Sequence, residues 1–444
     1  MIEGPQGPII STLPPNYQSR EFISWHSSWD RYPVNAWVYD GEEGSENYGP
    51  GGHHPVFIGD VFNGRYQVLS KLGYGMFSTV WLVKDLKSGP DDKTPYRAMK
   101  CLIAEAYNNP AGKKNIFELE ILKHLRDAGP GTTGHEFISH LLDDFEHEGP
   151  NGKHVCLIFE PMGETLQTFN TWFEANEKRI PRAVMRRFSI QLILAIMYAH
   201  HNGIIHTDIK PDNIFVKFRD FSLIENYLAE LEPVEQDREG DYKPLNSKPL
   251  RWDYFPEGDV DFSEFDICLG DWGVATWADN HLSDVIQPIR LRAPEVLIRA
   301  KDWDQSVDWW NFGCVLMQLS RRVCLFTGDH PLDGDYDFFM HLAQIEDLCG
   351  PFPRQLLDRG LPELVEDVFD ENCRVKADFH VIDGVNYRTE ECFRKLDSDE
   401  IMQDYVGQER EELVNFMRML MKVEPSERPT GVQLLRHPWL DALN

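Results

Sequence analysis

The feature that most constrains the fold of this chain is a change in the period of its apolar residues. Alternating apolar residues predict strands at 61–72, 78–86 and 96–103. An apolar run at 154–160 predicts a further, buried strand. Beyond it the spacing becomes helical, most clearly in residues 182–203, which end at a glycine that can stop a helix. We therefore expect a strand-rich beginning and a helix-rich remainder.

Two amphipathic stripes define the predicted helices. The stretch NIFELEILKHLR has helical spacing, and its apolar face consists of Ile116, Leu119, Leu122 and Leu125. The apolar stripe of the longer helix consists of Phe188, Leu192, Ala195 and Ala199.

The length and apolar content are those of a globular protein. The chain has 444 residues and a mass of 51.5 kDa, enough for one large two-lobed domain or two medium ones. Its apolar content is 42%, and no window approaches the roughly 20 uncharged apolar residues that span a bilayer. The first residues, MIEGPQGPII, contain neither the basic nor the apolar region of a signal peptide. We therefore expect neither secretion nor membrane insertion.

Charge and cysteine content limit the partners. Lysine and arginine number 44 and aspartate and glutamate 73, so the net charge is −29. Such a field repels nucleic-acid phosphates and attracts basic proteins, although an acidic surface is also a common means of solubility.

The eight cysteines form no Cys-x-x-Cys pair, which predicts buried thiols in a reducing compartment rather than disulfides or a zinc site.

Three segments depart from the regular pattern. Residues 1–59 form an N-terminal extension without a core of its own, whose Trp25, Trp29 and Trp37 either pack on the following domain or bind a partner. Residues 219–264 are polar, acidic and rich in proline, which is typical of a mobile insertion. Residues 351–405 are acidic and irregular, and we expect peripheral helices and loops there.

The stretch LGYGMFSTV places two glycines between two predicted strands. Glycine lets the backbone approach phosphate oxygens closely, although a hairpin with two glycines is by itself more often only a turn. The candidate phosphate-binding loop consists of Leu72, Gly73, Tyr74, Gly75, Met76, Phe77, Ser78, Thr79 and Val80. On the next strand Lys100 can reach nucleotide phosphates, and Glu118 on the following helix can pair with it, although a lone strand lysine is usually a surface charge.

The stretch HTDIKPDN, residues 206–213, gathers charged groups in one short loop. Asp208 can accept the proton of an attacking hydroxyl, and Lys210 can neutralise a migrating phosphoryl group. Asn213 can supply an oxygen to Mg²⁺. Further along, DWG adds Asp271, whose carboxylate oxygens suit a Mg²⁺ ion that bridges terminal phosphates.

Other residues are predicted to support this loop. RAPE and ERP predict a buried ion pair of Glu295 with Arg428, and Asp308 can hold the loop backbone from below. His206 is expected to be structural. Each of these residues alone would be an ordinary surface acid or base, but their common order along the chain argues against coincidence.

In these motifs the chain resembles the eukaryotic protein kinases over about residues 60–440. The closer resemblance is to the SR-protein kinases, which phosphorylate serines of arginine/serine-rich splicing factors. It is carried by IGDVFNGRYQVLSKLGYGMFSTVWL, HTDIKPDNIF, DWGVATW and LLRHPWL. The resemblance implies an α+β, bilobal protein kinase fold, with a small β-rich N-lobe at 60–163 and a larger α-helical C-lobe at 164–440.

The resemblance also implies ATP as the phosphoryl donor, Mg²⁺ as the metal, and a hinge at 159–162 where Glu160 and Met162 contact adenine. It implies catalytic roles for Lys100, Glu118, Asp208 and Lys210, and metal binding by Asn213 and Asp271. Basic arginine/serine-rich proteins would be the substrates, and the acids of residues 361–372 are candidates for their docking. We expect a monomer in the cytoplasm and nucleus that binds no membrane and no nucleic acid directly.

Some positions depart from the usual kinase pattern. Ser78 replaces the third glycine of the phosphate loop, as in SR-protein kinases, and Trp272 stands where most kinases have Phe. Pro288 replaces a threonine that usually bridges to the catalytic Asp and Lys, and Leu291 replaces a tyrosine. The last two changes leave substrate selection open.

Thr207 stands where the commonest kinase loop has an arginine. That arginine is a buried charge that a phosphate on the activation segment neutralises, and threonine has no such charge. The segment 271–295 carries just two hydroxyl residues, Thr276 and Ser283. We therefore predict an enzyme that is active without phosphorylation of this segment.

Two alternatives remain open. The first is a pseudokinase scaffold that binds basic partners, which Pro288 and Leu291 favour and the presence of Lys100, Asp208 and Asp271 opposes. The second is an active kinase whose substrates are not splicing factors.

Overall fold

The structure is a computed structural model, in which residues 42–444 form one compact unit. It describes residues 42–107, 116–129, 131–175, 178–218, 220–250, 265–329, 334–376, 381–382, 385–386 and 395–441. The predictions for Trp25, Trp29 and Trp37, and for the end of the insertion at 251–264, lie outside these residues.

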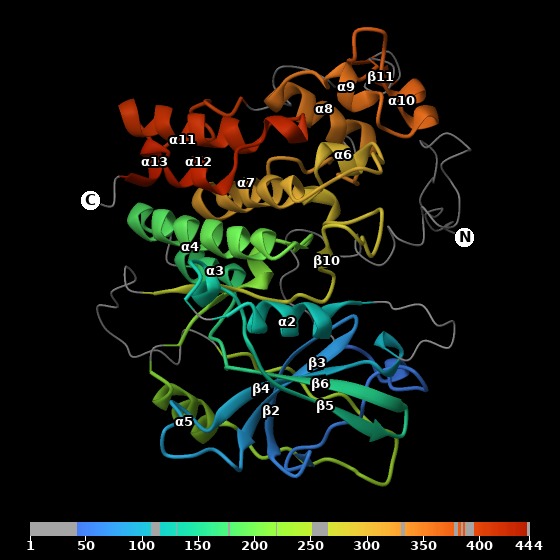
Figure 1. Cartoon of the computed structure of the whole chain (residues 1–444), viewed down its shortest axis with the longest axis vertical. Coiled ribbons are helices and arrows are strands. Elements are labelled where there is room, and N and C mark those ends of the chain that lie inside the picture. Colours follow the sequence, from blue (N-terminus) through green and yellow to red (C-terminus); the bar gives the residue numbers. More distant parts are fainter. Residues whose placement is uncertain are drawn as a thin grey trace, which may run out of the picture. The chain divides into compact units, whose positions relative to one another are not determined.

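A six-stranded antiparallel sheet forms the first lobe, which we call the sheet lobe (Figure 1). Its strands are β1 (Val61–Phe62), β2 (Tyr66–Gly75), β3 (Ser78–Asp85), β4 (Tyr96–Leu102), β5 (Leu141–Gly149) and β6 (Gly152–Phe159). They lie in the order β1-β2-β3-β4-β6-β5. Alternation places Trp81, Val83 and Met99 in a buried core on one face of the sheet. The predicted strands are therefore present, together with the acidic edge strand β5 that the sequence pattern did not indicate.

Helix α2 (Glu118–Asp127) lies against the sheet, and its buried face agrees with the predicted one except at Leu119. Ile116 precedes the helix, and Leu119 is only half-buried. The buried residues are Glu118, Ile121, Leu122 and Leu125. Ile116, Leu122 and Leu125 of the predicted face are thus buried, and the prediction was wrong only at Leu119, because Glu118, paired with a lysine of the sheet, takes the inward position.

The second, helical lobe is built around two long central helices, α4 (Arg182–His201) and α7 (Ser306–Arg321). The predicted stripe of α4 is buried, including Phe188, Leu192, Ala195 and Ala199. The other helices are α3 (Leu166–Ala175), α6 (Pro294–Leu297), α8 (Phe338–Cys349), α9 (Arg354–Leu357), α10 (Pro362–Val368), α11 (Gly407–Leu420), α12 (Gly431–Leu435) and α13 (Pro438–Asp441). The segment 351–405 contributes α9, α10 and the hairpin β11 (Val381–Ile382) and β12 (Val385–Asn386).

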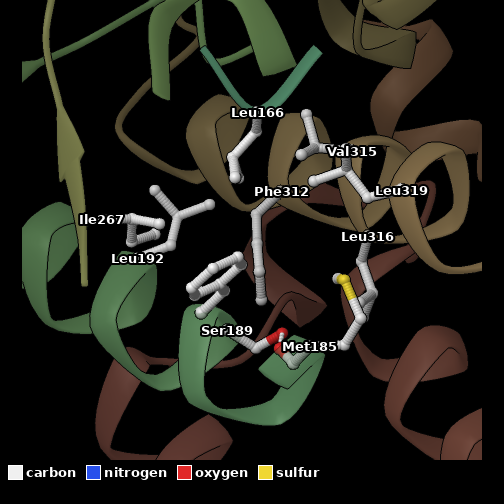
Figure 2. Close-up of a pocket in the computed structure, with 10 residues that line it drawn as sticks. Leu166, Met185, Ser189, Leu192, Ile267, Phe312, Val315, Leu316 and Leu319 are labelled. Carbon is white, nitrogen blue, oxygen red and sulfur yellow. Dashed lines mark hydrogen bonds between the residues drawn. The ribbon is translucent and has the colours of Figure 1, made fainter. Parts of the chain in front are cut away.

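Figure 2 shows the centre of this lobe, where side chains of α3, α4 and α7 converge. Leu192, Phe312 and Leu316 line a cavity of about 10 Å³. A space of this size with an apolar lining is a small packing defect rather than a ligand site. This cavity is therefore not a candidate functional site.

The insertion is not the mobile segment that its composition indicates, at least up to residue 250. It forms α5 (Ser222–Glu230), whose Ile224 and Tyr227 are buried against Leu82 of β3. Figure 1 shows α5 beside the sheet, although its sequence follows the first strands of the helical lobe. The prediction was wrong because acidic and proline residues surround a short helix that is stabilised by contacts distant in sequence.

The part of the N-terminal extension that the structure describes also packs on the sheet lobe. Lys71 of β2 is buried, and its Nζ contacts Glu42 at 2.7 Å, a carboxylate oxygen of Glu43 and the carbonyl oxygen of Leu245. The extension and the insertion thus meet at one buried lysine. Among the helices that the structure describes, none has both the length and the apolar content needed to cross a bilayer.

Candidate active site

The candidate phosphate loop is a tight hairpin that lies in register with Lys100. Gly75 pairs with Ser78, so Met76 and Phe77 form the turn between β2 and β3. Val80 pairs with Gly73 on one side and Lys100 on the other. Residues directly opposite each other on neighbouring strands point to the same face, so Lys100 shares a face with the loop.

Neither glycine of this loop is explained by packing within the chain. A Cβ atom at Gly73 or Gly75 would meet no other atom within 4 Å, and neither residue has a positive φ. Space for a close approach from outside the chain is therefore available above both residues. This observation fits the phosphate groups of a nucleotide.

Lys100 joins three elements through one ammonium group. Its Nζ lies 2.6 Å from Oε1 of Glu118 on α2 and 2.8 Å from Oδ1 of Asp271. Burial favours the neutral amine, but Asp271 and Glu118 outweigh it and hold the pKa of Lys100 above its usual value. Enclosure favours the neutral acid at Asp271, but Lys100 outweighs it and holds the pKa of that carboxyl far below its usual range. The lysine is therefore charged and fixed in direction.

Glu118 is the partner most affected by burial. Its side chain is 1% exposed, and burial raises the pKa of this carboxyl although Lys100 opposes the shift. The ion pair that the sequence suggested is present, on the inward face of α2.

The loop 206–213 begins after β7 (Ile204–Ile205) and ends in a short 3-10 helix, Pro211–Asn213. Nζ of Lys210 and Nδ2 of Asn213 each donate to Oδ2 of Asp208 at 2.9 Å. Asn213 also donates to the carbonyl of Asp208 at 2.9 Å, so its amide oxygen points away from this carboxylate. Asp208 raises the pKa of Lys210 against the opposing effect of burial. Lys210 and Asp271 lie within electrostatic reach, so the two groups of charges belong to one site.

Asp308 holds the backbone at the start of this loop. Its two carboxylate oxygens accept hydrogen bonds of 2.9 Å from the backbone N–H groups of His206 and Thr207. Thr207 has a positive φ of 65°, a strained conformation for a β-branched residue. The buried carboxylate stabilises that conformation, which is the role that the sequence suggested for Asp308.

Asp271 follows β9 (Ile267–Leu269), which pairs with β8 (Ile214–Val216). Its φ is 56°, also in the left-handed region. His206 is buried and its Nε2–H donates to the carbonyl of Gly270 at 3.0 Å, which agrees with a structural role. Trp272 is fully buried, and its Nε1 donates to Oγ of Ser139 at 3.0 Å. Ser139 belongs to no motif, so sequence reasoning had no signal for it.

The hinge residues lie in the connector between β6 and α3. Glu160 and Met162 are half-buried. The connector is fixed to β8, since the N–H of Gly163 donates to the carbonyl of Val216 at 2.8 Å.

Two kinds of contact hold the end of the segment 271–295: hydrogen bonds of an amide side chain and a buried ion pair. Gln287, which belongs to no recognisable motif, donates to the carbonyl of Val307 and accepts from the N–H of Ala293, both at 2.9 Å. The predicted pair is present, because Arg428 donates to both carboxylate oxygens of Glu295 at 2.6 and 2.7 Å. Both side chains of this pair are buried.

The donor set suits magnesium rather than zinc. Asp271 and Asn213 supply hard oxygens at one end of the cluster, and the side chain of Asp271 is 46% exposed. Within the described ranges, no group of three acidic, histidine or cysteine side chains surrounds a preformed metal site. Mg²⁺ is commonly held by one or two carboxylates plus substrate phosphates, so these residues fit it.

Comparison with known proteins agrees with this geometry. The protein kinase domain family matches residues 66–236 and 257–440. The serine/threonine-protein kinase SRPK of Physarum polycephalum is 29% identical over 428 residues, which cover 91% of this chain and 92% of that protein. A serine/threonine protein kinase of Aspergillus fumigatus is 32% identical over 403 residues, which cover 90% of this chain and 91% of that protein. The crystal structure of a kinase domain has a TM-score of 0.63 at 23% identity and covers 87% of this chain and 98% of its own.

The chain belongs to the protein kinase family, with its bilobal fold. More closely, it is a serine/threonine kinase of the type of its relatives named SRPK, dsk1, SKY1 and CLK. The predicted family is therefore confirmed. A protein kinase domain implies ATP as the phosphoryl donor and usually Mg²⁺.

Proposed function

We propose that this kinase transfers the γ-phosphoryl group of Mg·ATP to serines of basic, arginine/serine-rich proteins that act in mRNA splicing. The observation that carries the catalytic part is the meeting of two charged clusters, Asp208 with Lys210 and Lys100 with Asp271, within electrostatic reach of each other. The name of the relative serine/threonine-protein kinase SRPK supports the substrate class.

The proposed chemistry is direct, in-line transfer. Asp208 holds the serine hydroxyl through its carboxylate and accepts the proton as the oxygen forms its bond to the γ-phosphorus. The bond between that phosphorus and the β–γ bridging oxygen breaks, and ADP leaves with that oxygen. Lys210, already beside Asp208, lies where it can balance the charge of the phosphoryl group in transit.

The sheet lobe binds the nucleotide in this proposal. Lys100 is held by Glu118 in a direction that lets its ammonium contact phosphate oxygens, beneath the hairpin that contains Gly73 and Gly75. Glu160 and Met162 of the hinge contact the adenine base. Asn213 and Asp271 hold Mg²⁺, which supplies positive charge against the terminal phosphates when it is bound.

An exposed acidic face supports the choice of basic substrates. Helix α10 exposes Glu363, Glu366 and Asp367, whose spacing of three and four residues places them on one face. The net charge of −29 acts in the same sense by attracting basic chains to the molecule. We propose that this face contributes to docking of arginine-rich segments.

Constitutive activity is also part of the proposal. Thr207 is uncharged and buried, and Gln287 fastens the end of the segment 271–295 without any phosphate. Protein made in bacteria and treated with phosphatase should therefore be active. Protein that is inactive until an upstream kinase is added would contradict this.

One experiment tests both the reaction and the substrate. The purified protein and its Asp208→Ala variant are incubated with labelled Mg·ATP, an arginine/serine repeat peptide and a generic basic protein. We expect label on the repeat peptide with the wild type alone. Equal label with both proteins would exclude catalysis by Asp208. Label on the generic protein alone would favour other substrates, a result that Pro288 and Leu291 make worth testing.

A further inference from the structure

The residue after Asp271 makes a side-chain hydrogen bond that depends on its being tryptophan. The indole of Trp272 is fully buried, and its Nε1–H donates to Oγ of Ser139 at 3.0 Å. A phenylalanine at this position would fill most of the same space but would have no N–H group. The bond is therefore a property of this pair of residues.

Ser139 is itself fixed by the strand that leads to Asp271. Its backbone N–H donates to the carbonyl of Leu269 at 2.8 Å, and Ile138 forms a parallel bridge with the same residue. Ser139 is thus held at the entrance of β5, and it presents a fixed acceptor to the indole.

The position of Asp271 depends on two features, its backbone conformation and the ion pair of its side chain. Its φ of 56° lies in the left-handed region, which aspartate adopts more readily than most residues other than glycine, and its carboxylate lies 2.8 Å from Nζ of Lys100. Contacts bracket it on both sides. His206 donates to Gly270 before it, and Thr207 donates to the carbonyl of Val274 at 2.8 Å after it.

Trp272, the residue directly after Asp271, adds a third contact to these two. Its ring packs against the ring of His206, with centroids 4.8 Å apart and planes at 61°. The hydrogen bond to Ser139 adds a directional contact to this ring packing. The backbone of Asp271 is covalently joined to that of Trp272, so a fixed indole limits where the carboxylate can lie.

We propose that the hydrogen bond from Trp272 to Ser139 holds Asp271 in the geometry that binds Mg²⁺, so that Trp272 and Ser139 are positioning residues for phosphoryl transfer. This inference rests on the proposed role of Asp271 as a metal ligand. The contacts that bracket Asp271 are made by residues of the chain itself and involve no phosphate group, so the arrangement needs no phosphorylation.

The test removes each partner separately. Trp272→Phe deletes the donor and Ser139→Ala deletes the acceptor, while Ser139→Thr keeps the hydroxyl. We expect both deletions to lower kcat about tenfold, the factor that corresponds to one buried hydrogen bond. Both should raise the Mg²⁺ concentration needed for half-maximal activity. The double variant should be no worse than either single variant, and Ser139→Thr should retain the wild-type Mg²⁺ requirement.

Two further measurements separate positioning from general loss of stability. Binding of ADP in the presence of a chelator should be unchanged in all variants, since it does not use Asp271. Trp439→Phe serves as the matched control, because Trp439 is buried in α13 and its Nε1 has no partner among the described residues. This variant should lose thermal stability without any change in the Mg²⁺ requirement.

Each outcome bears on the proposal. An unchanged Mg²⁺ requirement in Ser139→Ala would overturn it, even if Trp272→Phe fails to fold. Additive effects in the double variant would also overturn it. A wild-type protein that neither binds Mg·ATP nor phosphorylates any substrate would instead refute the proposed function, so the two failures are distinguishable.

Discussion

The hydroxyl of Thr207 donates a hydrogen bond of 2.8 Å to the backbone carbonyl of Val274. This bond joins the loop that carries Asp208 to the segment that carries Asp271. Thr207, which stands where most kinases have an arginine, thus makes an uncharged hydrogen bond at this position. Because this bond links the two segments without a phosphate, it supports the prediction of activity without phosphorylation.

Replacing Thr207 by valine should lower kcat without changing the fold. Valine has nearly the shape of threonine but no hydroxyl, so the carbonyl of Val274 would lose its donor. A lost hydrogen bond of this kind costs about 1 kcal/mol, so we expect about a fivefold lower kcat. Steady-state kinetics with a saturating peptide substrate would measure it.

The control is Thr207→Ser, which keeps the hydroxyl and should retain most of the activity. Wild-type kcat in Thr207→Val would show that the bond does not position the segment.

Replacing Glu118 by glutamine should weaken nucleotide use. The ammonium of Lys100 would keep only Asp271 as a charged partner, so it would be drawn toward that carboxylate. Hydrogen bonds to charged groups contribute about 1.5–3 kcal/mol, which predicts a fall in kcat/KM for ATP of about 10- to 100-fold. Asp127→Asn on the same helix is the control, because its carboxylate is exposed and pairs only with Arg126 in the described structure. Equal effects of the two changes would contradict the role of Glu118.

The sequence predicted the charged residues of the site and the support of the loop by Asp308, but not the uncharged residues Ser139 and Gln287. Asp208, Asn213 and Asp271 lie in short motifs whose chemistry can be recognised without coordinates. Ser139 accepts a hydrogen bond from Trp272, which lies far along the chain, and Gln287 binds both the nearby Ala293 and the more distant Val307. Nothing in the local sequence of Ser139 or Gln287 marks these contacts. Such contacts depend on tertiary structure alone.

The same distinction holds for the fold. Strands such as β3 and β6 were predictable because their apolar pattern matches the burial they acquire. Strand β5 was not predicted because it carries Asp143 and Asp144, whose partners Arg65 and Lys123 come from other elements. Helix α5 was not predicted, because acidic and proline residues surround it in the sequence. Local pattern thus failed where long-range pairing decides the structure.

The contact of α5 with the sheet gives a test of the corrected view of the insertion. The hydroxyl of Tyr227 lies 2.7 Å from both Oγ of Ser70 and the carbonyl of Lys248. Tyr227→Phe should therefore lower the free energy of unfolding by about 1–2 kcal/mol. Thermal or urea unfolding would measure the loss. If the insertion were mobile in solution, this variant would be as stable as the wild type.

The buried pair of Glu295 and Arg428 should be a strong stability contact. Removing one partner leaves an uncompensated buried charge, so Arg428→Ala should cost about 3–5 kcal/mol. The matched control is Arg418→Ala, since Arg418 and Asp397 form a pair in which both side chains are more than half exposed. That change should cost less than about 1 kcal/mol. Urea unfolding of both variants would compare them, and equal losses would contradict the difference in burial.

Buried histidines should make the protein less stable as the pH falls below neutrality. Burial lowers the pKa of His54 to about 3, of His140 to about 4 and of His341 to about 3. The unfolded chain binds these protons near pH 6.5, so between pH 6.5 and the lowered values it holds more protons than the native protein. Stability is therefore complete above pH 6.5 and decreases through this window, by up to about 1.4 kcal/mol per pH unit for each histidine.

His341 is the most informative of the three to replace. It is fully buried, its ring packs against Phe326, and Arg292 and Arg290 add to the lowering of its pKa. His341→Phe removes a titrating group while keeping a ring, so the melting temperature of this variant should fall less steeply between pH 7 and pH 5 than that of the wild type. Identical slopes for the two proteins would show that protonation of His341 does not limit stability in acid.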